Sequence, residues 1–211
     1  KYRSTLKNYW SYKKLDPNDN RIKSQIMIKM FVVGISHKKA SIEDREQVFL
    51  RPLERELLLN TLKNEPSIAE AMIISTCNRT EIYIGIVANE VNKDDVLNLL
   101  FKVKKISLVR ELRSLFYCYT DEECLRHLLR VITGLESIVL GERQILGQVK
   151  EANEMYRAKG MFLKRFNVLS DIVVRTGKKA QHETDISCGG GSISWAAVKM
   201  AQSIMKTLTD K

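Results

Sequence analysis

The sequence contains little of what several protein classes require. Its 211 residues include three prolines, ten glycines, four cysteines and three histidines. So few prolines and glycines exclude a collagenous or low-complexity chain. The cysteine spacing fits neither a disulfide framework nor a paired CxxC metal site, and three histidines are too few for a multi-histidine metal centre. We therefore expect no metal.

Long hydrophobic runs are also missing. No stretch approaches the roughly 20 apolar residues that a membrane helix needs, and the first residues lack the apolar core of a secretion signal. We therefore expect a cytoplasmic protein without a membrane partner. Hydrophobic residues still make up 44% of the chain, enough for the core of one or two ordinary domains.

Positive charge is in excess and unevenly distributed. Lys and Arg number 35 against 25 Asp and Glu, which gives a net charge of +10. Two segments hold this excess, residues 1–27 with +5 and residues 157–182 with +6. The first is polar and shows no sustained period, so it is either an extension ordered by docking or a solvated tail.

The first half of the chain alternates between strand and helix patterns. Apolar runs predict strands over 30–35, 69–75, 79–87 and 114–119, with helices over 51–64 and 94–103. In the first helix, Leu53, Leu57, Leu58 and Leu62 recur at helical spacing, which predicts that they share one apolar face. The strand over 79–87 alternates apolar and polar residues, which is typical of a half-buried strand. This β-α-β-β-α-β order predicts an α+β, ferredoxin-like antiparallel sheet with helices on one face.

The second half reads as helical throughout. Helices are expected over 121–133, 147–159, 163–179 and 192–207, separated by glycines. We expect four parts: a basic extension over 1–27, a sheet subdomain over 28–120, a helical subdomain over 121–188 and a long final helix over 189–211.

The segment STCNRTEIY, residues 75–83, carries the densest chemical signal. Cys77 lies where the second strand gives way to the third, and a nearby cation can turn a thiol into a nucleophile. If the backbone stays extended, Arg79 leaves the same face and offers a guanidinium fork for a substrate carboxylate. The same residues also fit a buried small cysteine beside a surface arginine. Of the other cysteines, Cys118 and Cys124 are expected in the core, and Cys188 is expected to be accessible.

The segment HLLRVITGLESIVLGERQILGQVK, residues 127–150, carries the second signal. His127 lies among leucines on an amphipathic helix, and a histidine in such a place is more often a core residue than a catalyst. Polar residues near the following helix start either converge on a ligand or cap the helix. They are Ser137, Glu142, Gln144 and Gln148.

Four blocks of this sequence resemble glutamyl-tRNA reductase in the same order. They are GISHKKAS, STCNRTEIY, the 127–150 segment and KKAQHETDIS, and the resemblance covers about residues 31–205. It implies the family's N-terminal catalytic domain and the start of its spinal helix. In that family a NADPH-binding Rossmann domain and a helical dimerisation domain follow. The substrate would be glutamyl-tRNA, and the product would lead to 5-aminolevulinate and tetrapyrroles.

The resemblance also implies roles for individual residues. Cys77 matches the nucleophile that forms a thioester with the glutamyl group. His127 matches a histidine important for activity, which either protonates the leaving ribose hydroxyl or polarises the carbonyl. His37 is a weaker candidate for shaping the site. The glutamate pocket would be lined by Thr76, Asn78, Arg79, Ser137, Glu142, Arg143, Gln144 and Gln148.

The basic 157–182 stretch fits contact with the tRNA backbone through Arg175, Lys178 and Lys179, although a solvated helix face fits it equally well.

The chain departs from the family pattern at several points. Lys39 and Ser41 replace the usual Thr and Pro, and Arg143 replaces a small residue or Pro, which affects the expected shape of the pocket. No GxGxxG motif follows a strand, so NADPH would be bound by a domain absent from this chain. Alone, the chain is expected to form the thioester and hydrolyse it. The alternative is a non-catalytic tRNA-binding or regulatory domain that retains the fold.

Overall fold

The computed structural model describes residues 29–86, 91–107, 110–187 and 193–205. The predicted extension over 1–27 and Cys188 lie outside these ranges. Among the described residues, no helix is long and apolar enough to cross a membrane.

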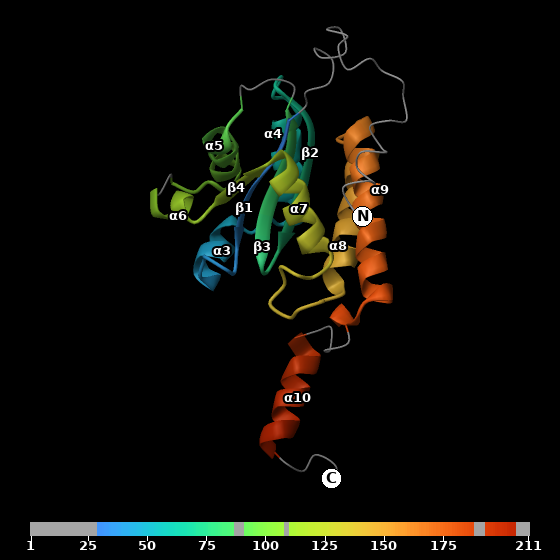
Figure 1. The fold of residues 1–211 in the computed structure, drawn as a ribbon. Helices are drawn as coiled ribbons and strands as arrows, with labels where there is room; N and C mark the ends of the chain where they lie inside the picture. Colours follow the sequence, from blue (N-terminus) through green and yellow to red (C-terminus); the bar gives the residue numbers. More distant parts are fainter. Residues whose placement is uncertain (1–28, 87–90, 108–109, 188–192, 206–211) are drawn as a thin grey trace, which may run out of the picture.

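A four-stranded antiparallel sheet forms the centre of the fold (Figure 1). Its order is β2-β3-β1-β4, and it is made of β1 (Lys29–Ser36), β2 (Ile68–Thr76), β3 (Arg79–Ile86) and β4 (Tyr117–Thr120). Thr76 pairs with Arg79, so β2 and β3 form a hairpin with a two-residue turn. The α+β prediction is confirmed, whereas the finer ferredoxin-like assignment stays a prediction.

One face of the sheet is covered by helices from the first half of the chain. They are α3 (Ile42–Val48), α4 (Pro52–Lys63) and α5 (Lys93–Lys104), with the short α6 (Arg110–Ser114) beside them. A capping box of Ser41 and Asp44 starts α3, a helix that the periodicity did not predict. In α4 the residues Leu58, Leu59 and Leu62 are buried, but Leu53 and Leu57 face outward. The expectation that these two belong to the core face was wrong.

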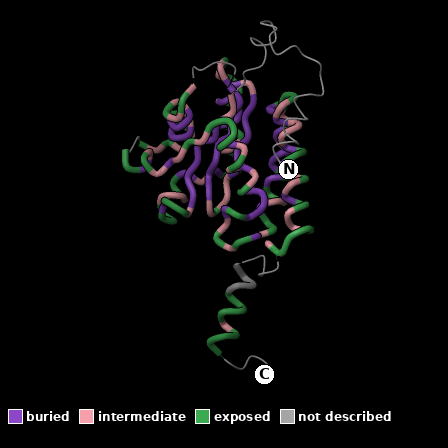
Figure 2. Tube along the Cα trace, in the orientation of Figure 1, coloured by how far each residue is buried: buried purple, intermediate pink, exposed green. Residues whose placement is uncertain are grey.

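The other face is covered by helices from the second half. They are α7 (Asp121–Ile132), α8 (Gln144–Ala158) and α9 (Lys164–Glu183), and α7 and α8 contact β1, β2 and β4. Every residue of β3 is consequently buried (Figure 2). The expectation that β3 is half-buried was therefore wrong. The helices within the β-α-β-β-α-β half lie on one face of the sheet, and the helices of the second half cover the other. Apolar and polar side chains alternate along β3, but both sets are buried, one on each face of the sheet.

The end of the first half also differs from the prediction. Residues 110–114 are helical and β4 starts only at Tyr117, so the expected strand over 114–119 begins too early. Cys118 is exposed, contrary to its expected place in the core, because β4 is an edge strand whose alternate residues point away from the packed face. Cys124 on α7 is fully buried, as predicted.

The chain continues beyond α9 through a short 3-10 helix, η1 (Asp185–Ser187), to α10 (Ile193–Met205). Figure 1 shows α10 apart from the packed body. The four predicted parts of the chain stay a prediction, since the helices of the 121–188 part pack directly on the sheet of the 28–120 part.

Candidate active site

The tip of the β2–β3 hairpin carries Cys77, whose side chain is exposed. Cys77 and Asn78 form the turn itself, so the extended backbone that would place Cys77 and Arg79 on one face is not present. Two neighbours hold this turn. The backbone N–H of His37 donates to the Asn78 carbonyl at 3.0 Å, and Arg45 Nε donates to the Cys77 carbonyl at 3.2 Å. The nucleophile candidate is thus exposed on a backbone that is hydrogen-bonded in place.

Thr76 and Asn78, the neighbours of Cys77, are half-buried. The Thr76 hydroxyl accepts a hydrogen bond from the backbone N–H of Asn78 at 3.2 Å, which tightens the turn. These two residues therefore form part of a rigid turn around Cys77, and their place in a glutamate pocket stays a prediction.

Arg79 starts β3 and is buried, with 2% of its side chain exposed. Its Nη1 donates to Glu81 Oε1 at 3.0 Å, and its Nη2 donates to the main-chain carbonyl of Glu136. The carboxylate in this guanidinium fork is therefore the protein's own. A contact between Arg79 and a substrate carboxylate stays a prediction.

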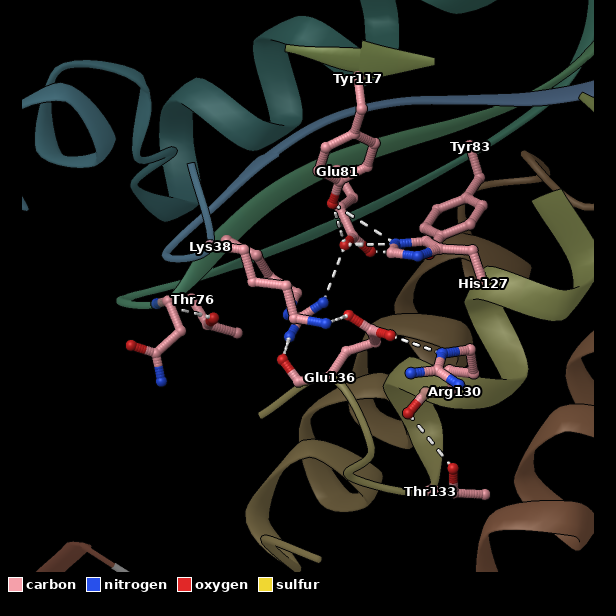
Figure 3. A network of polar contacts seen from close by, with 11 residues as sticks. Lys38, Thr76, Glu81, Tyr83, Tyr117, His127, Arg130, Thr133 and Glu136 are labelled. Atoms are coloured by element: carbon pink, nitrogen blue, oxygen red, sulfur yellow. Dashed lines mark hydrogen bonds and ion pairs between the residues drawn. The ribbon is translucent and has the colours of Figure 1, made fainter. Parts of the chain in front are cut away.

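Glu81 is the centre of the buried polar network (Figure 3). Besides Arg79, three donors converge on its carboxylate: His127 Nε2 at 2.9 Å, the Tyr117 hydroxyl at 2.6 Å and the Tyr83 hydroxyl at 2.7 Å. Side-chain alternation places these groups on the sheet face that α7 covers. The structure thus brings together Arg79 and His127, which lie 48 positions apart in the sequence, through one carboxylate that the sequence analysis had not singled out.

Charge and hydrogen bonding fix the protonation of this network. Burial alone would raise the pKa of Glu81, but the Arg79 charge and the hydrogen bonds from His127 and Tyr117 lower it to about 2. Burial and the Glu81 charge raise the pKa of Tyr83 and Tyr117, so both hydroxyls stay protonated. An ionised carboxylate only accepts, so His127 carries its proton on Nε2. In the neutral imidazole, Nδ1 is then the basic nitrogen.

A cleft of about 290 Å³ opens above this network. It lies between the turn after β1, strand β4, helix α7 and the loop that follows α7. The imidazole of His127, with 11% of its side chain exposed, forms part of its wall. The lining residues are Ser36, Lys38, Lys39, Tyr117, Tyr119, Glu123, Arg126, His127, Arg130 and Glu136.

Comparison with known proteins identifies the family. Residues 33–184 match the family model "Glutamyl-tRNAGlu reductase, N-terminal domain". The chain belongs to this family. A glutamyl-tRNA reductase from Picosynechococcus sp. is 37% identical over 187 residues, which are 87% of this chain and 43% of that protein. One from Bacillus subtilis is 37% identical over 182 residues, or 86% of this chain and 40% of that protein.

A solved structure gives the same result. Glutamyl-tRNA reductase from Methanopyrus kandleri superposes with a TM-score of 0.65 at 27% identity, covering 82% of this chain and 39% of that one. The chain thus spans about two fifths of the length of the reductases that it matches.

Five predicted pocket residues of the 127–150 segment do not line the cleft, although His127, Arg130 and Glu136 of the same segment do. Ser137 is half-buried in the loop after α7, and Glu142 is half-buried just before α8. Arg143 is the residue before the first turn of α8 and is exposed. Gln144 and Gln148 are exposed on the first two turns. The helix start was predicted three residues late, and the pocket role of these residues stays a prediction.

His37 lies between the hairpin and the cleft. Its Nδ1 is buried without a hydrogen-bond partner, and burial together with the charges of Arg79 and Arg45 lowers its pKa. An imidazole with a lowered pKa therefore stands next to the Cys77 turn, and its part in shaping the site stays a prediction.

The remaining predicted residues lie elsewhere. Arg175, Lys178 and Lys179 are exposed on α9, where Lys179 pairs with Glu183 at 3.6 Å. Their exposure fits both open readings, a tRNA contact and a solvated helix face. No group of three or more metal-ligating side chains occurs among the described residues.

The site contains residues that the sequence analysis missed, among them Glu81, Tyr117 and Glu136. A signal was present for Glu81, because a carboxylate in the strand RTEIYIGI needs a buried partner once both faces are covered. Glu136 lies only six residues from Arg130, with which it forms an ion pair at 2.5 Å. Its contacts with Lys38 and Arg79 depend on tertiary structure alone.

Proposed function

We propose that this chain is the acyl-transfer part of a glutamyl-tRNA reductase, in which Cys77 takes the glutamyl group from the tRNA ester. The observation that carries the proposal is the exposed Cys77 thiol on a turn fastened to the wall of the cleft. The turn after β1 provides the link, since His37 bonds to Asn78 and Lys38 lines the cleft. Family membership supplies the substrate class, glutamyl-tRNA.

The chemistry is a nucleophilic acyl substitution. The Cys77 thiolate attacks the ester carbonyl carbon, a C–S bond forms, and the C–O bond to the ribose breaks. The ribose oxygen leaves with a proton. We assign the proton transfers to Nδ1 of His127, which takes the thiol proton and returns it to the ribose oxygen. Glu81 holds the tautomer that leaves Nδ1 free for this task.

The reduction that follows would use NADPH, which supplies a hydride. The described residues do not fit this cofactor, because the sheet is antiparallel and no described strand leads through a glycine-rich turn into a helix. Hydride transfer is therefore placed outside this chain. The whole reductase, which we expect to be a homodimer, would release glutamate-1-semialdehyde, the precursor of 5-aminolevulinate and of tetrapyrroles. This chain alone would release glutamate by hydrolysis of the thioester.

The test is incubation of the chain with glutamyl-tRNA in the absence of NADPH. Intact-mass spectrometry should detect one glutamyl group on the wild-type chain, and ester cleavage should exceed the background. Both should vanish in Cys77→Ser and persist in Cys118→Ser, which removes a second exposed thiol.

Equal cleavage by wild type and Cys77→Ser would refute the acyl-transfer role. It would favour the alternative, a tRNA-binding or regulatory domain. The exposed cations on α9 are the observation that supports this alternative. Neutralising Lys178 and Lys179 would then reduce the salt dependence of tRNA binding.

A further inference from the structure

Glu136 joins two parts of the site that lie far apart in the chain. Its carboxylate is contacted from two sides, by Lys38 of the turn after β1 and by Arg130 of α7, the latter at 2.5 Å (Figure 3). Lys38 and Glu136 are 98 positions apart in the sequence. The acyl-transfer chemistry makes no use of this carboxylate, so its place between two cations has another purpose.

The carboxylate is buried and ionised. Only 9% of the Glu136 side chain is exposed, whereas about half of each cationic side chain is exposed. Burial alone would raise the pKa of Glu136, but the hydrogen bonds and charges of Lys38 and Arg130 lower it below its ordinary value. A buried charge attracts its partners more strongly than a charge in water does. The two contacts therefore constrain the elements that carry the cations.

On one side, the contact continues to the nucleophile. Lys38 follows His37, whose backbone N–H donates to the Asn78 carbonyl at 3.0 Å, and Asn78 follows Cys77 in the hairpin turn. Arg45 donates to carbonyls of both turns, at 2.8 Å in the turn after β1 and at 3.2 Å in the hairpin. The turn after β1 and the hairpin tip are therefore bonded into one unit.

On the other side, the contact continues to the imidazole. Arg130 lies three residues after His127 on α7, so both side chains leave the same face of that helix. The loop that carries Glu136 is fixed to the end of α7, because the backbone N–H of Leu135 donates to the Arg130 carbonyl at 2.9 Å. Glu136 is thus attached to the helix that presents His127.

From these contacts we infer that Glu136 is a positioning residue for acyl transfer. It acts through Lys38 and the turn after β1, and it holds the Cys77 hairpin at the distance from the His127 imidazole that proton transfer needs. This role rests on the proposed function, because Cys77 and His127 are the groups to which that function assigns the attack and the proton transfers.

A second carboxylate joins the same two parts inside the protein. Glu81 binds both His127 and Arg79, the first residue of β3, but it makes no printed contact with the turn after β1. Removal of the Glu136 charge should therefore leave the fold intact and free the turn, together with the hairpin tip, from α7. A displacement of about 1 Å at a reacting group can lower a rate about 100-fold.

The test measures transfer of the glutamyl group from glutamyl-tRNA to Cys77 in a single turnover, followed by intact-mass spectrometry. In Glu136→Gln the rate at saturating tRNA should fall at least tenfold, because the hairpin tip is no longer held. The tRNA concentration that gives half the maximal rate should stay equal or fall, because two cations at the cleft lose their carboxylate. General damage to the fold would impair both quantities, so opposite effects on rate and affinity identify positioning.

Three variants separate this role from others. Glu136→Asp keeps the charge and should transfer the glutamyl group at least threefold faster than Glu136→Gln. Lys38→Met breaks the same connection, so the Lys38→Met/Glu136→Gln variant should be no slower than the slower single variant. The matched control is Glu122→Gln, which breaks a 3.0 Å ion pair with Arg126 within α7 and should stay within twofold of the wild type.

A measurement without substrate follows the turn itself. The backbone N–H of Lys39 donates to the Ser36 carbonyl at 3.2 Å, and its hydrogen exchange should accelerate severalfold in Glu136→Gln. Slow transfer with unchanged exchange would overturn the inference, because the loss would then come from the charge and not from the position of the turn.

Failure of the inference is distinguishable from failure of the proposed function. A wild-type rate in Glu136→Gln, or additive losses in the double variant, would overturn the positioning role while the acyl transfer stands. If the wild type itself acquires no glutamyl group, the proposed function is wrong, and the positioning role falls with it.

Discussion

Replacing Glu81 by Gln should destabilise the fold by an amount that the structure allows to be calculated. Arg79 would lose its counter-ion while 98% of its side chain remains buried. Breaking a buried pair by removing one partner costs about 3–5 kcal/mol. Glutamine has the size of glutamate and keeps one acceptor oxygen, so the lower limit of this range applies. The Tyr83 hydroxyl, which donates to Glu81 at 2.7 Å, would then lie against the amide group of the glutamine. We expect a loss of about 3 kcal/mol at pH 7.

The pH dependence gives an independent value for the same quantity. The pKa of Glu81 falls from an ordinary 4.5 to about 2 in the folded chain, which corresponds to about 3 kcal/mol. Because the folded pKa is the lower one, this stability is fully present above pH 4.5 and is lost as the pH falls towards 2. The difference between wild type and Glu81→Gln should therefore shrink across that window.

Urea unfolding at pH 7 and at several values down to pH 2.5 measures this difference, and at neutral pH the melting temperature should fall by roughly 10 °C. Glu123→Gln is the control, since Glu123 lines the same cleft but is exposed, and it should stay within about 0.5 kcal/mol of the wild type. A loss below about 1 kcal/mol for Glu81→Gln, or a difference that persists unchanged at pH 2.5, would refute the account of the network.

Two further predictions concern the parts that hold this network and the hairpin. Arg45→Ala removes the donors to the carbonyls of Ala40, at 2.8 Å, and Cys77, at 3.2 Å, so amide hydrogen exchange at His37 should accelerate severalfold. An unchanged rate would contradict the role of Arg45 in holding the hairpin turn. In Gly34→Ala the new Cβ would lie 2.8 Å from the Tyr117 ring, which should cost about 1–3 kcal/mol in thermal unfolding. Gly147→Ala, at a helical position with open space, should instead stabilise by about 0.5–1 kcal/mol, and equal effects of the two substitutions would rule out the clash.

The sequence predicts β1, β2 and β3 to within two residues, because their apolar runs are bounded by turns. The prediction that β3 is half-buried was wrong. Arg79 and Glu81 have the spacing of a water-facing edge, and local alternation does not distinguish residues that face water from residues that neutralise each other inside the protein. The outward-facing Leu53 and Leu57 show the opposite error, since apolar residues at helical spacing do not identify which neighbour covers them.

The candidate site could be predicted only in part for a related reason. Cys77 and His127 became candidates because their motifs are contiguous in the sequence. The cleft is made by residues from the turn after β1, from β4, from α7 and from the loop after α7. Such contacts, including the one between Lys38 and Glu136, join positions up to about a hundred residues apart and leave no local pattern.

The contact between Arg79 and the Glu136 carbonyl differs in kind from the others at the site, because a main-chain atom makes it. Any amino acid at position 136 offers the same oxygen, so a substitution there would release Lys38 and Arg130 while the loop stays attached to the sheet. The electrostatics of the pocket entrance can therefore vary from one relative to another without cost to the architecture beneath it.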